Sequence, residues 1–241
     1  MDLAGVANAN RIAPALVRDR TYHADMNRKA PPKIASHLEL FDCITCNKCL
    51  PVCPNAANFS IPTGAKTLRM IHYRVEGDEF LPIPGEDFVL KKEYQIANLA
   101  DFCNECGDCD TYCPEYGGPF IAKPRFFGSR ATYEKFAGYE GFYFPSPLTM
   151  IGRIEGQEFQ LACDVERREY TFRSSKIELK LDQHDQRLAS KRIAGTQKSD
   201  YIDMRPYYIM RTLMEGLLAD REAYPAIISG FQMNGQVSES C

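Results

Sequence analysis

The chain has 241 residues, a formal net charge of −3 and ten cysteines. Its length allows a sizeable core in one or two domains, and its slightly acidic balance argues against nucleic acid as a main partner. No run of about 18 apolar residues is present, so we expect no membrane-spanning segment. The first residues lack the basic start and apolar core of a secretory signal, so we expect a reducing, cytoplasmic location.

Residues 1–38 are expected to form an N-terminal arm. A short helix is expected around Ile12–Arg20, followed by extended chain because Pro31 and Pro32 disfavour a helix. The arm carries four apolar anchors, namely Leu16, Val17, Tyr22 and Met26. The segment is therefore either a disordered terminus or an arm that lies on another subunit.

Two cysteine motifs follow, and both have the spacing C-x2-C-x2-C-x3-C-P that bacterial-type ferredoxins use to hold [4Fe–4S] clusters. The first motif consists of Cys43, Cys46, Cys49 and Cys53, followed by Pro54, and the second of Cys103, Cys106, Cys109 and Cys113, followed by Pro114. Three closely spaced cysteines can hold three irons of a cluster, and in two-cluster ferredoxins the fourth ligand comes from the other motif.

We therefore predict two [4Fe–4S] clusters with crossed ligands. The ligands of the first cluster are Cys43, Cys46, Cys49 and Cys113. The ligands of the second cluster are Cys103, Cys106, Cys109 and Cys53. A structural zinc site would use two separated C-x2-C pairs and leave a third cysteine without a role, and disulfides between such close cysteines would be strained.

The predicted fold is α+β, with a bacterial dicluster ferredoxin-like core over residues 39–128. Between the motifs, alternating side chains predict a β-rich insertion at 64–92, in which Pro82 and Pro84 lie on strand edges. A helical turn is expected over Tyr94–Ala100. His72 lies in the insertion and is interpreted as a core or surface histidine and not as a ligand.

Ten aromatic residues lie between Tyr116 and Phe144, interleaved with glycine and proline. This pattern disfavours a long helix and predicts a loop-rich shell over the clusters, with residues 129–149 forming an aromatic-rich connector. Because aromatic residues are enriched at interfaces, the same run is also compatible with a docking face.

The last part of the chain, residues 150–241, is expected to form a small antiparallel sheet and a C-terminal helix. Period-two alternation between 150 and 181 predicts three strands, with Cys163 as a core thiol on the apolar face. Residues 182–199 read as a polar linker, and Pro206–Ala219 reads as a helix. The tail, which includes Cys241, is expected to be loose.

Apart from the eight cysteines, the sequence contains no catalytic constellation and no glycine-rich nucleotide-binding loop. The chain therefore has no predicted catalytic site of its own. Carboxylates gather near the second motif, at Asp101, Glu105, Asp108, Asp110 and Glu115. Negative charge disfavours adding an electron, so the second cluster is predicted to have the lower potential, unless solvent screens these carboxylates.

The segments Phe41–Phe59 and Ala100–Gly107 resemble the iron–sulfur portions of a group of flavoproteins. The group includes dihydropyrimidine dehydrogenase-like enzymes, glutamate synthase small-subunit-like reductases and selenate reductase-like flavoproteins. The resemblance covers roughly residues 28–130 and is weaker at 150–180. It implies clusters that relay electrons between an NAD(P)H-reduced FAD and a second redox centre. The FAD, NAD(P)H and FMN domains are absent from the 241 residues, which implies that they lie on separate subunits.

The resulting hypothesis is an electron-transfer subunit of a multi-subunit oxidoreductase. Its expected partners are an FAD- and NAD(P)H-dependent reductase subunit and a further redox or substrate-reducing subunit. A structural iron–sulfur scaffold and a free soluble ferredoxin remain as alternatives.

Overall fold

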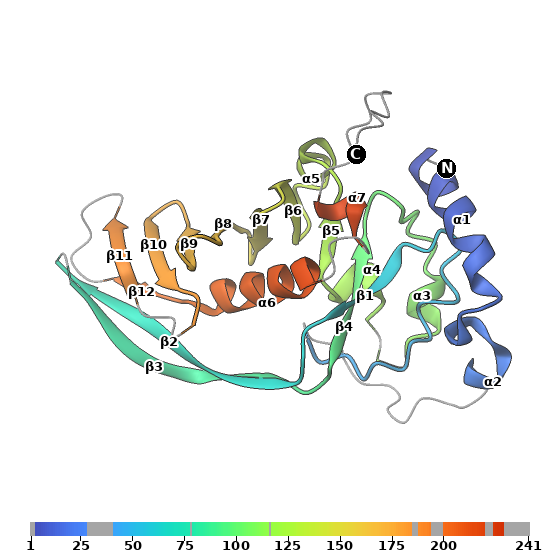
Figure 1. The fold of residues 1–241 in the computed structure, drawn as a ribbon, viewed down its shortest axis with the longest axis horizontal. Helices are drawn as coiled ribbons and strands as arrows, with labels where there is room; N and C mark the ends of the chain where they lie inside the picture. Colours follow the sequence, from blue (N-terminus) through green and yellow to red (C-terminus); the bar gives the residue numbers. More distant parts are fainter. Residues whose placement is uncertain are drawn as a thin grey trace.

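The computed structural model describes the chain in seven stretches. These are residues 3–27, 41–77, 79–115, 117–184, 188–193, 200–219 and 224–228. The described part is a mixed α+β structure with one large sheet, one smaller sheet and a long helix between them (Figure 1).

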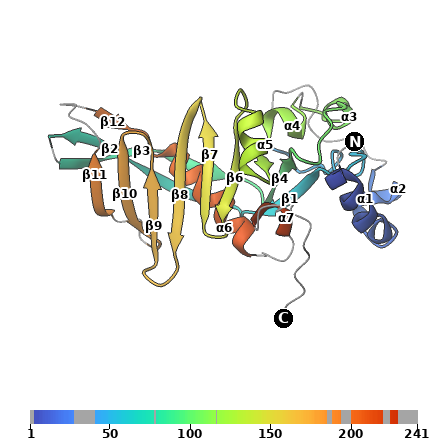
Figure 2. The same ribbon diagram turned by 90° about the horizontal axis from the view of Figure 1, so that it is seen from above.

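The larger sheet has nine strands in the order β1-β4-β5-β6-β7-β8-β9-β10-β11. Their bounds are β1 Asn58–Pro62, β4 Tyr94–Leu99, β5 Arg125–Phe127, β6 Gly141–Ser146, β7 Thr149–Ile154, β8 Gln157–Asp164, β9 Glu169–Arg173, β10 Ile177–Asp182 and β11 Leu188–Ile193. The pairs β4–β5 and β5–β6 are parallel and the others are antiparallel. Seen from above, the sheet runs from the cysteine-bearing loops to the opposite end of the molecule (Figure 2).

The smaller sheet is a long hairpin of β2 (Lys66–Glu76) and β3 (Glu79–Leu90), joined at one edge by β12 (Asp200–Ile202). Pro82 and Pro84 pair with Tyr73 and Ile71 of β2, and β3 is an edge strand of the smaller sheet as described. Proline has no backbone N–H to donate, so it is tolerated on an edge strand better than in a central strand, which needs hydrogen bonds on both sides.

The long helix α6 (Arg205–Ala219) lies between the two sheets (Figure 1). It begins where the Asp203 carboxylate accepts a hydrogen bond from the backbone N–H of Arg205 at 2.8 Å. Tyr207 packs its ring on Phe172 of the large sheet, whereas Tyr208 accepts a hydrogen bond from the backbone N–H of Ile71 in the hairpin. The helix therefore joins both sheets into one apolar core.

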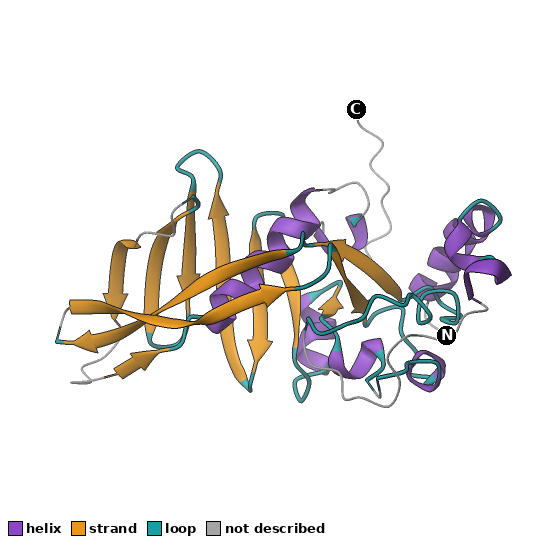
Figure 3. Cartoon of the chain, turned by 90° about the horizontal axis from the view of Figure 1, so that it is seen from below, coloured by secondary structure: helices purple, strands orange, loops and turns teal. Residues whose placement is uncertain are grey.

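Helix α1 and several short helices gather at one end of the molecule, the end that carries the cysteine motifs (Figure 3). They are α1 Leu3–Leu16, the 3-10 helix Arg20–Tyr22, α2 Ala24–Asn27, α3 Asp108–Thr111 and α4 Pro119–Ala122. Two more, α5 Arg130–Lys135 and α7 Pro225–Ile228, lie beside the large sheet. No helix of the described stretches is long and apolar enough to span a bilayer.

The structure corrects three of the sequence-based expectations for the sheets. Residues 94–99 are strand β4 and not a helical turn, because β4 is sandwiched between β1 and β5 and buried from Gln95 onward. The polar residues read as a linker contain β11, which pairs with β10. The region from 150 to 181 contains four strands and not three, namely β7, which begins at Thr149, and β8 to β10. These strands belong to the large sheet and do not form a separate small one.

The predictions for the helices, the hairpin and the aromatic connector are confirmed only in part. The helix predicted at Pro206–Ala219 is confirmed as α6, and the strands predicted between the motifs are β2 and β3. The first helix begins at Leu3 and not at Ile12, with Pro14 in its last turn. The aromatic connector contains α5 and β6. The expectations for Pro31, Pro32, Tyr116 and the tail with Cys241 concern residues outside the described stretches.

Candidate metal centre

The two cysteine motifs adopt matching backbone conformations. In the first motif Thr45 and Asn47 have positive φ angles of 54° and 61°, and in the second Glu105 and Gly107 have φ of 54° and 85°. These are the same two positions of C-x2-C-x2-C, one directly before and one directly after the second cysteine. Left-handed residues at both points turn the chain tightly enough for successive thiols to face one interior.

Backbone N–H groups point at the sulfurs in both motifs. The N–H of Thr45 donates to Cys43 Sγ at 3.3 Å, and the N–H of Glu105 donates to Cys103 Sγ at 3.4 Å. The N–H of Ala57 also donates to Cys53 Sγ at 3.2 Å. Such donors stabilise negative charge on thiolate sulfur, which is the form that binds metal.

Cys53 of the first motif lies among the thiols of the second. Burial raises the pKa of the Cys109 thiol to about 11; a hydrogen bond from Asn58 opposes that rise, and the thiolates of Cys53, Cys103 and Cys106 add to it. The pKa of Cys103 is likewise raised, chiefly by burial, and Cys53 contributes. Thiolates influence one another in this way only when they are close together.

Cys113 of the second motif lies near thiols of the first. Burial raises the pKa of Cys46, and the thiolates of Cys43 and Cys113 add to that rise. Burial also raises the pKa of Cys49 to about 12, with contributions from Cys43, Cys46 and Cys109. The influence of Cys109 on Cys49 indicates that the two groups of thiols are neighbours.

Two buried asparagines on neighbouring strands support the thiols. Asn58 on β1 and Asn98 on β4 are direct partners in the sheet, and Asn98 Nδ2 donates to Asn58 Oδ1 at 2.9 Å. Asn58 Nδ2 also donates to the carbonyl of Cys49 at 2.8 Å. The amide of Asn58 hydrogen-bonds the sulfur of Cys109, and the amide of Asn98 hydrogen-bonds the sulfur of Cys103. Strands β1 and β4 are therefore connected to both motifs.

Two buried cations flank the cysteines. Lys123, at the end of α4, is 9% exposed, and its pKa is raised by the thiolates of Cys49, Cys43 and Cys113 against the opposing effect of burial. Arg125, at the start of β5, is 5% exposed and pairs with the Glu105 carboxylate at 3.2 Å. Burying a cation is costly unless negative charge compensates it, so both positions imply anionic neighbours.

The carboxylates near the second motif mostly have structural partners. Asp101 accepts hydrogen bonds from the Gly128 N–H and the Thr132 hydroxyl, and Asp110 accepts one from the Gly118 N–H. Glu115 is 1% exposed and accepts a hydrogen bond from the N–H of Ile44, which belongs to the first motif. Of the five, Asp108 is an exposed carboxylate beside the second motif.

The donor set fits iron–sulfur ligation. The nine cysteines of the described stretches are free of disulfide bonds, and eight of them form the two motifs. Within these stretches, no three histidine, cysteine or acidic side chains converge as ligands of a single metal ion. The eight thiols, the backbone N–H groups aimed at them and the flanking cations together form an environment suited to anionic thiolate-bound clusters.

The remaining residues singled out in the sequence lie away from the motifs. His72 is 6% exposed and accepts a hydrogen bond from the Met204 N–H, as expected for a core histidine. Cys163 packs at the edge of the apolar core and accepts a hydrogen bond from Gln183. In the aromatic run, Phe126, Phe127 and Tyr133 are buried, which agrees with a shell that fills the core.

Sequence reasoning missed Lys123, Arg125, Asn58 and Asn98 as members of the site. No spacing rule connects them with the cysteines, since they approach through β1, β4 and β5, whose pairing is long-range. A weak signal was available at Lys123 and Arg125, because two cations flank Pro124 in a stretch that is otherwise rich in buried aromatic residues.

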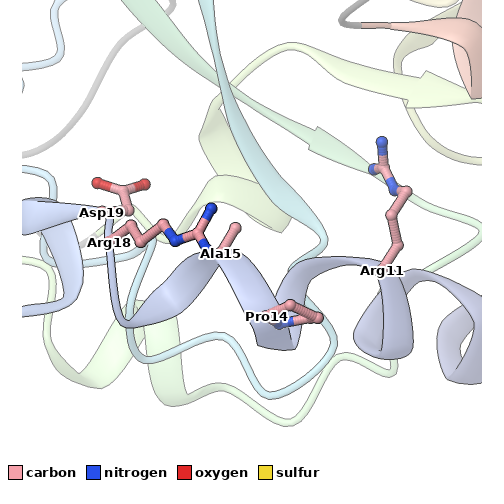
Figure 4. Close-up of a pocket in the computed structure, with 5 residues that line it drawn as sticks. All are labelled: Arg11, Pro14, Ala15, Arg18 and Asp19. Carbon is pink, nitrogen blue, oxygen red and sulfur yellow. The ribbon is translucent and has the colours of Figure 1, made fainter.

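One pocket lies on the N-terminal arm, away from the motifs. It is lined by Arg11, Pro14, Ala15, Arg18 and Asp19 (Figure 4). The Arg11 and Arg18 side chains are drawn apart from each other, and their guanidinium groups do not converge. Arg11 instead donates to the Asn8 side chain at 3.0 Å, so this pocket offers no arrangement for cofactor chemistry.

Comparison with known proteins agrees with the site. Residues 39–116 match the family described as 4Fe-4S dicluster domain. The chain is 33% identical over 119 residues, 49% of its length, to "Putative oxidoreductase YgfK" of Escherichia coli (strain K12). It is 28% identical over 121 residues, 50% of its length, to the protein of that name in Escherichia coli O157:H7. The chain spans only 9% of the length of each relative. No solved structure matches significantly.

Residues 39–116 are therefore similar to a 4Fe-4S dicluster domain, and this similarity, together with the likeness to oxidoreductases, supports 4Fe–4S binding and an iron–sulfur electron-transfer role.

Proposed function

We propose that this chain is an electron-transfer subunit that holds two [4Fe–4S] clusters with crossed ligands and relays single electrons within a multi-subunit oxidoreductase of the cytoplasm. Its partners in the proposal are a flavin subunit that oxidises NAD(P)H and a second redox subunit. When bound, such clusters supply one-electron chemistry without proton transfer or a substrate site. The matches to an oxidoreductase and to the dicluster family support the proposal.

The observation that supports the proposal is that the fourth cysteine of each motif lies near thiols of the other motif. Cys53 influences Cys103 and Cys109 of the other motif, and Cys113 influences Cys46 of the other motif. Cys109 also contributes to the raised pKa of Cys49, and the two side chains belong to one buried group, which supports two adjacent centres. Adjacent centres allow an electron that enters at one side of the domain to leave at the other.

Single cysteine variants test the crossed ligation. After anaerobic reconstitution, iron and sulfide analysis is expected to give two clusters for the parent protein, and electron paramagnetic resonance of the reduced protein is expected to show interacting spins. Cys53→Ser should alter the signal that Cys106→Ser also alters, and Cys113→Ser should alter the signal that Cys46→Ser alters. Cys163→Ser is the control and should change neither signal.

The opposite grouping, in which Cys53→Ser and Cys46→Ser affect the same signal, would contradict the crossed assignment. The relay itself is tested on the native complex purified from its source. Adding NAD(P)H should reduce the clusters within turnover time. Clusters that stay oxidised while the complex turns over would favour a purely structural scaffold.

A further inference from the structure

The two predicted clusters have unequal electrostatic surroundings, and the difference originates in one short segment. Lys123 and Arg125 are both buried, and Pro124 separates them. Phe120 and Ala122, just before Lys123, pack against the apolar group that contains Cys43 and Cys49 of the first motif and Cys109 of the second. The segment therefore passes directly between the two motifs.

Lys123 faces the first motif without a carboxylate partner. Within the described stretches no acidic side chain forms an ion pair with it. The groups that raise the pKa of its ammonium, against burial, are the thiolates of Cys49, Cys43 and Cys113, and Cys43 is also its hydrogen-bond partner. In return, the ammonium lowers the pKa of Cys49, opposing the rise that burial causes.

Arg125 faces the second motif, but its charge is already balanced. Its guanidinium pairs with Glu105 at 3.2 Å, donates to the carbonyl of Phe120, and stacks at 4.8 Å on the ring of Tyr139. The amides of Asn58 and Asn98 also reach the second cluster's thiols, but as neutral dipoles. The Glu115 carboxylate lies near the first motif, where it accepts from Ile44 and has a further partner.

We propose that Lys123 determines which cluster holds the electron, because its buried ammonium, which has no carboxylate partner in the described part of the chain, raises the reduction potential of the first cluster above that of the second. The inference rests on the proposed function, since it assumes that both clusters are bound. A reduced cluster carries more negative charge than an oxidised one, and a nearby cation stabilises the reduced form. An electron shared by the two centres would then rest beside Lys123.

The test is a potentiometric titration of reconstituted protein followed by electron paramagnetic resonance. Lys123→Met removes the charge and keeps the side-chain length, and it should lower the higher midpoint potential while leaving the lower one unmoved. Cys46→Ser identifies the signal of the first cluster. Lys180→Met is the matched control, because Lys180 lies on β10 toward the other end of the large sheet, and it should leave both potentials unchanged (Figure 1).

A second variant acts at the surface and does not disturb the core. Glu105 is an exposed residue, and Glu105→Gln releases the charge of Arg125 from its carboxylate partner. This variant should raise the reduction potential of the second cluster and so reduce the difference between the potentials of the two clusters. A tenfold change in how an electron is shared between the two centres corresponds to 59 mV for a one-electron couple.

If Lys123→Met does not assemble, Lys123→Gln takes its place, because it also removes the charge but keeps a polar group, and an unmoved higher potential in that variant overturns the inference. Equal shifts in Lys123→Met and Lys180→Met would also overturn it. A protein that binds fewer than two clusters by iron and sulfide analysis would instead contradict the proposed function. The two failures are therefore distinguishable.

Discussion

The Asn58 side chain shows how a single buried amide connects the two cysteine motifs. It is 6% exposed, donates to the carbonyl of Cys49, and accepts from Asn98 on the neighbouring strand. Replacing it by leucine would leave the Cys49 carbonyl and the Asn98 amide buried without partners. Leaving a buried polar group unsatisfied costs about 1–3 kcal/mol.

We therefore expect Asn58→Leu to lower the free energy of unfolding by about 1–3 kcal/mol, measured by anaerobic denaturant titration of the reconstituted protein. Asn104→Leu is the control, because Asn104 is exposed in the second motif. Equal stability of the two variants would show that the hydrogen bonds of Asn58 to Cys49 and Asn98 do not stabilise the site.

Gly216 marks the tightest approach of α6 to the large sheet. A Cβ atom at this position would lie 2.2 Å from the carbonyl oxygen of Pro62 and 2.6 Å from Ile61 Cγ2, so helix and strand would have to separate. Overpacking of this kind costs about 1–3 kcal/mol. Gly216→Ala should lower the thermal midpoint, whereas Gly138→Ala, whose Cβ meets nothing within 4 Å, should leave it unchanged.

At the residue scale, the sequence predicted the cysteines but not their surroundings. The cysteine motifs are local, so their spacing alone indicates the chemistry. Asn58, Asn98 and Lys123 reach the motifs only because β1, β4 and β5 pair across long stretches of chain. No local pattern encodes that pairing.

At the scale of elements, the side chain of Asn8 attaches the N-terminal helix α1 to the chain's own cysteine end. Asn8 is 4% exposed, and its Nδ2 donates to the carbonyls of Asn55 at 2.9 Å and Ala56 at 3.1 Å. Both acceptors directly follow Cys53 and Pro54. The arm therefore packs beside a predicted ligand of the second cluster.

Asn8→Ala should loosen this attachment while leaving the rest of the fold intact. A hydrogen bond contributes about 1 kcal/mol, so amide exchange in α1 should accelerate about five- to tenfold, measured by mass spectrometry. Asn10→Ala is the matched control, because it makes the same substitution at an exposed position of the same helix. Equal exchange in the two variants would mean that other contacts hold the arm.

Periodicity predicted the elements that have one apolar face and failed for those that do not. The strands β7 to β10 and the helix α6 alternate or repeat clearly, and their sequences indicated them. Strand β4 is buried at nearly every position, so it shows no alternation and resembled a helical turn. Strand β11 is polar and owes its conformation to pairing with β10. Tertiary contacts decide such segments.

At the scale of the whole molecule, the stabilising contacts are unevenly distributed. The large apolar core joins α6, the hairpin and strands β7 to β10, and it reaches the cysteine end only at its margin, through Phe41, Ala57 and Phe102, with Cys53 and Cys103 packed against it. The other buried thiols belong to a small separate group, formed by Cys43, Cys49, Ile96 and Cys109 with a few half-buried neighbours. Much of this end is loop, and the thiols in it are the groups that metal ligation would fix.

Removing the clusters should therefore unfold one end of the molecule and not the whole. After anaerobic chelation of iron, we expect faster amide exchange in residues 41–57 and 100–115, because the loops lose the metal that joins them. Strands β8 and β9 and helix α6 should keep their protection, since their core contains no motif cysteine among its fully buried members such as Phe172, Leu161 and Tyr207. Loss of protection in α6 together with the loops would contradict this separation and would show that the clusters stabilise the entire fold. Reconstitution of the same sample should restore slow exchange in the loops, which distinguishes reversible local unfolding from damage to the chain.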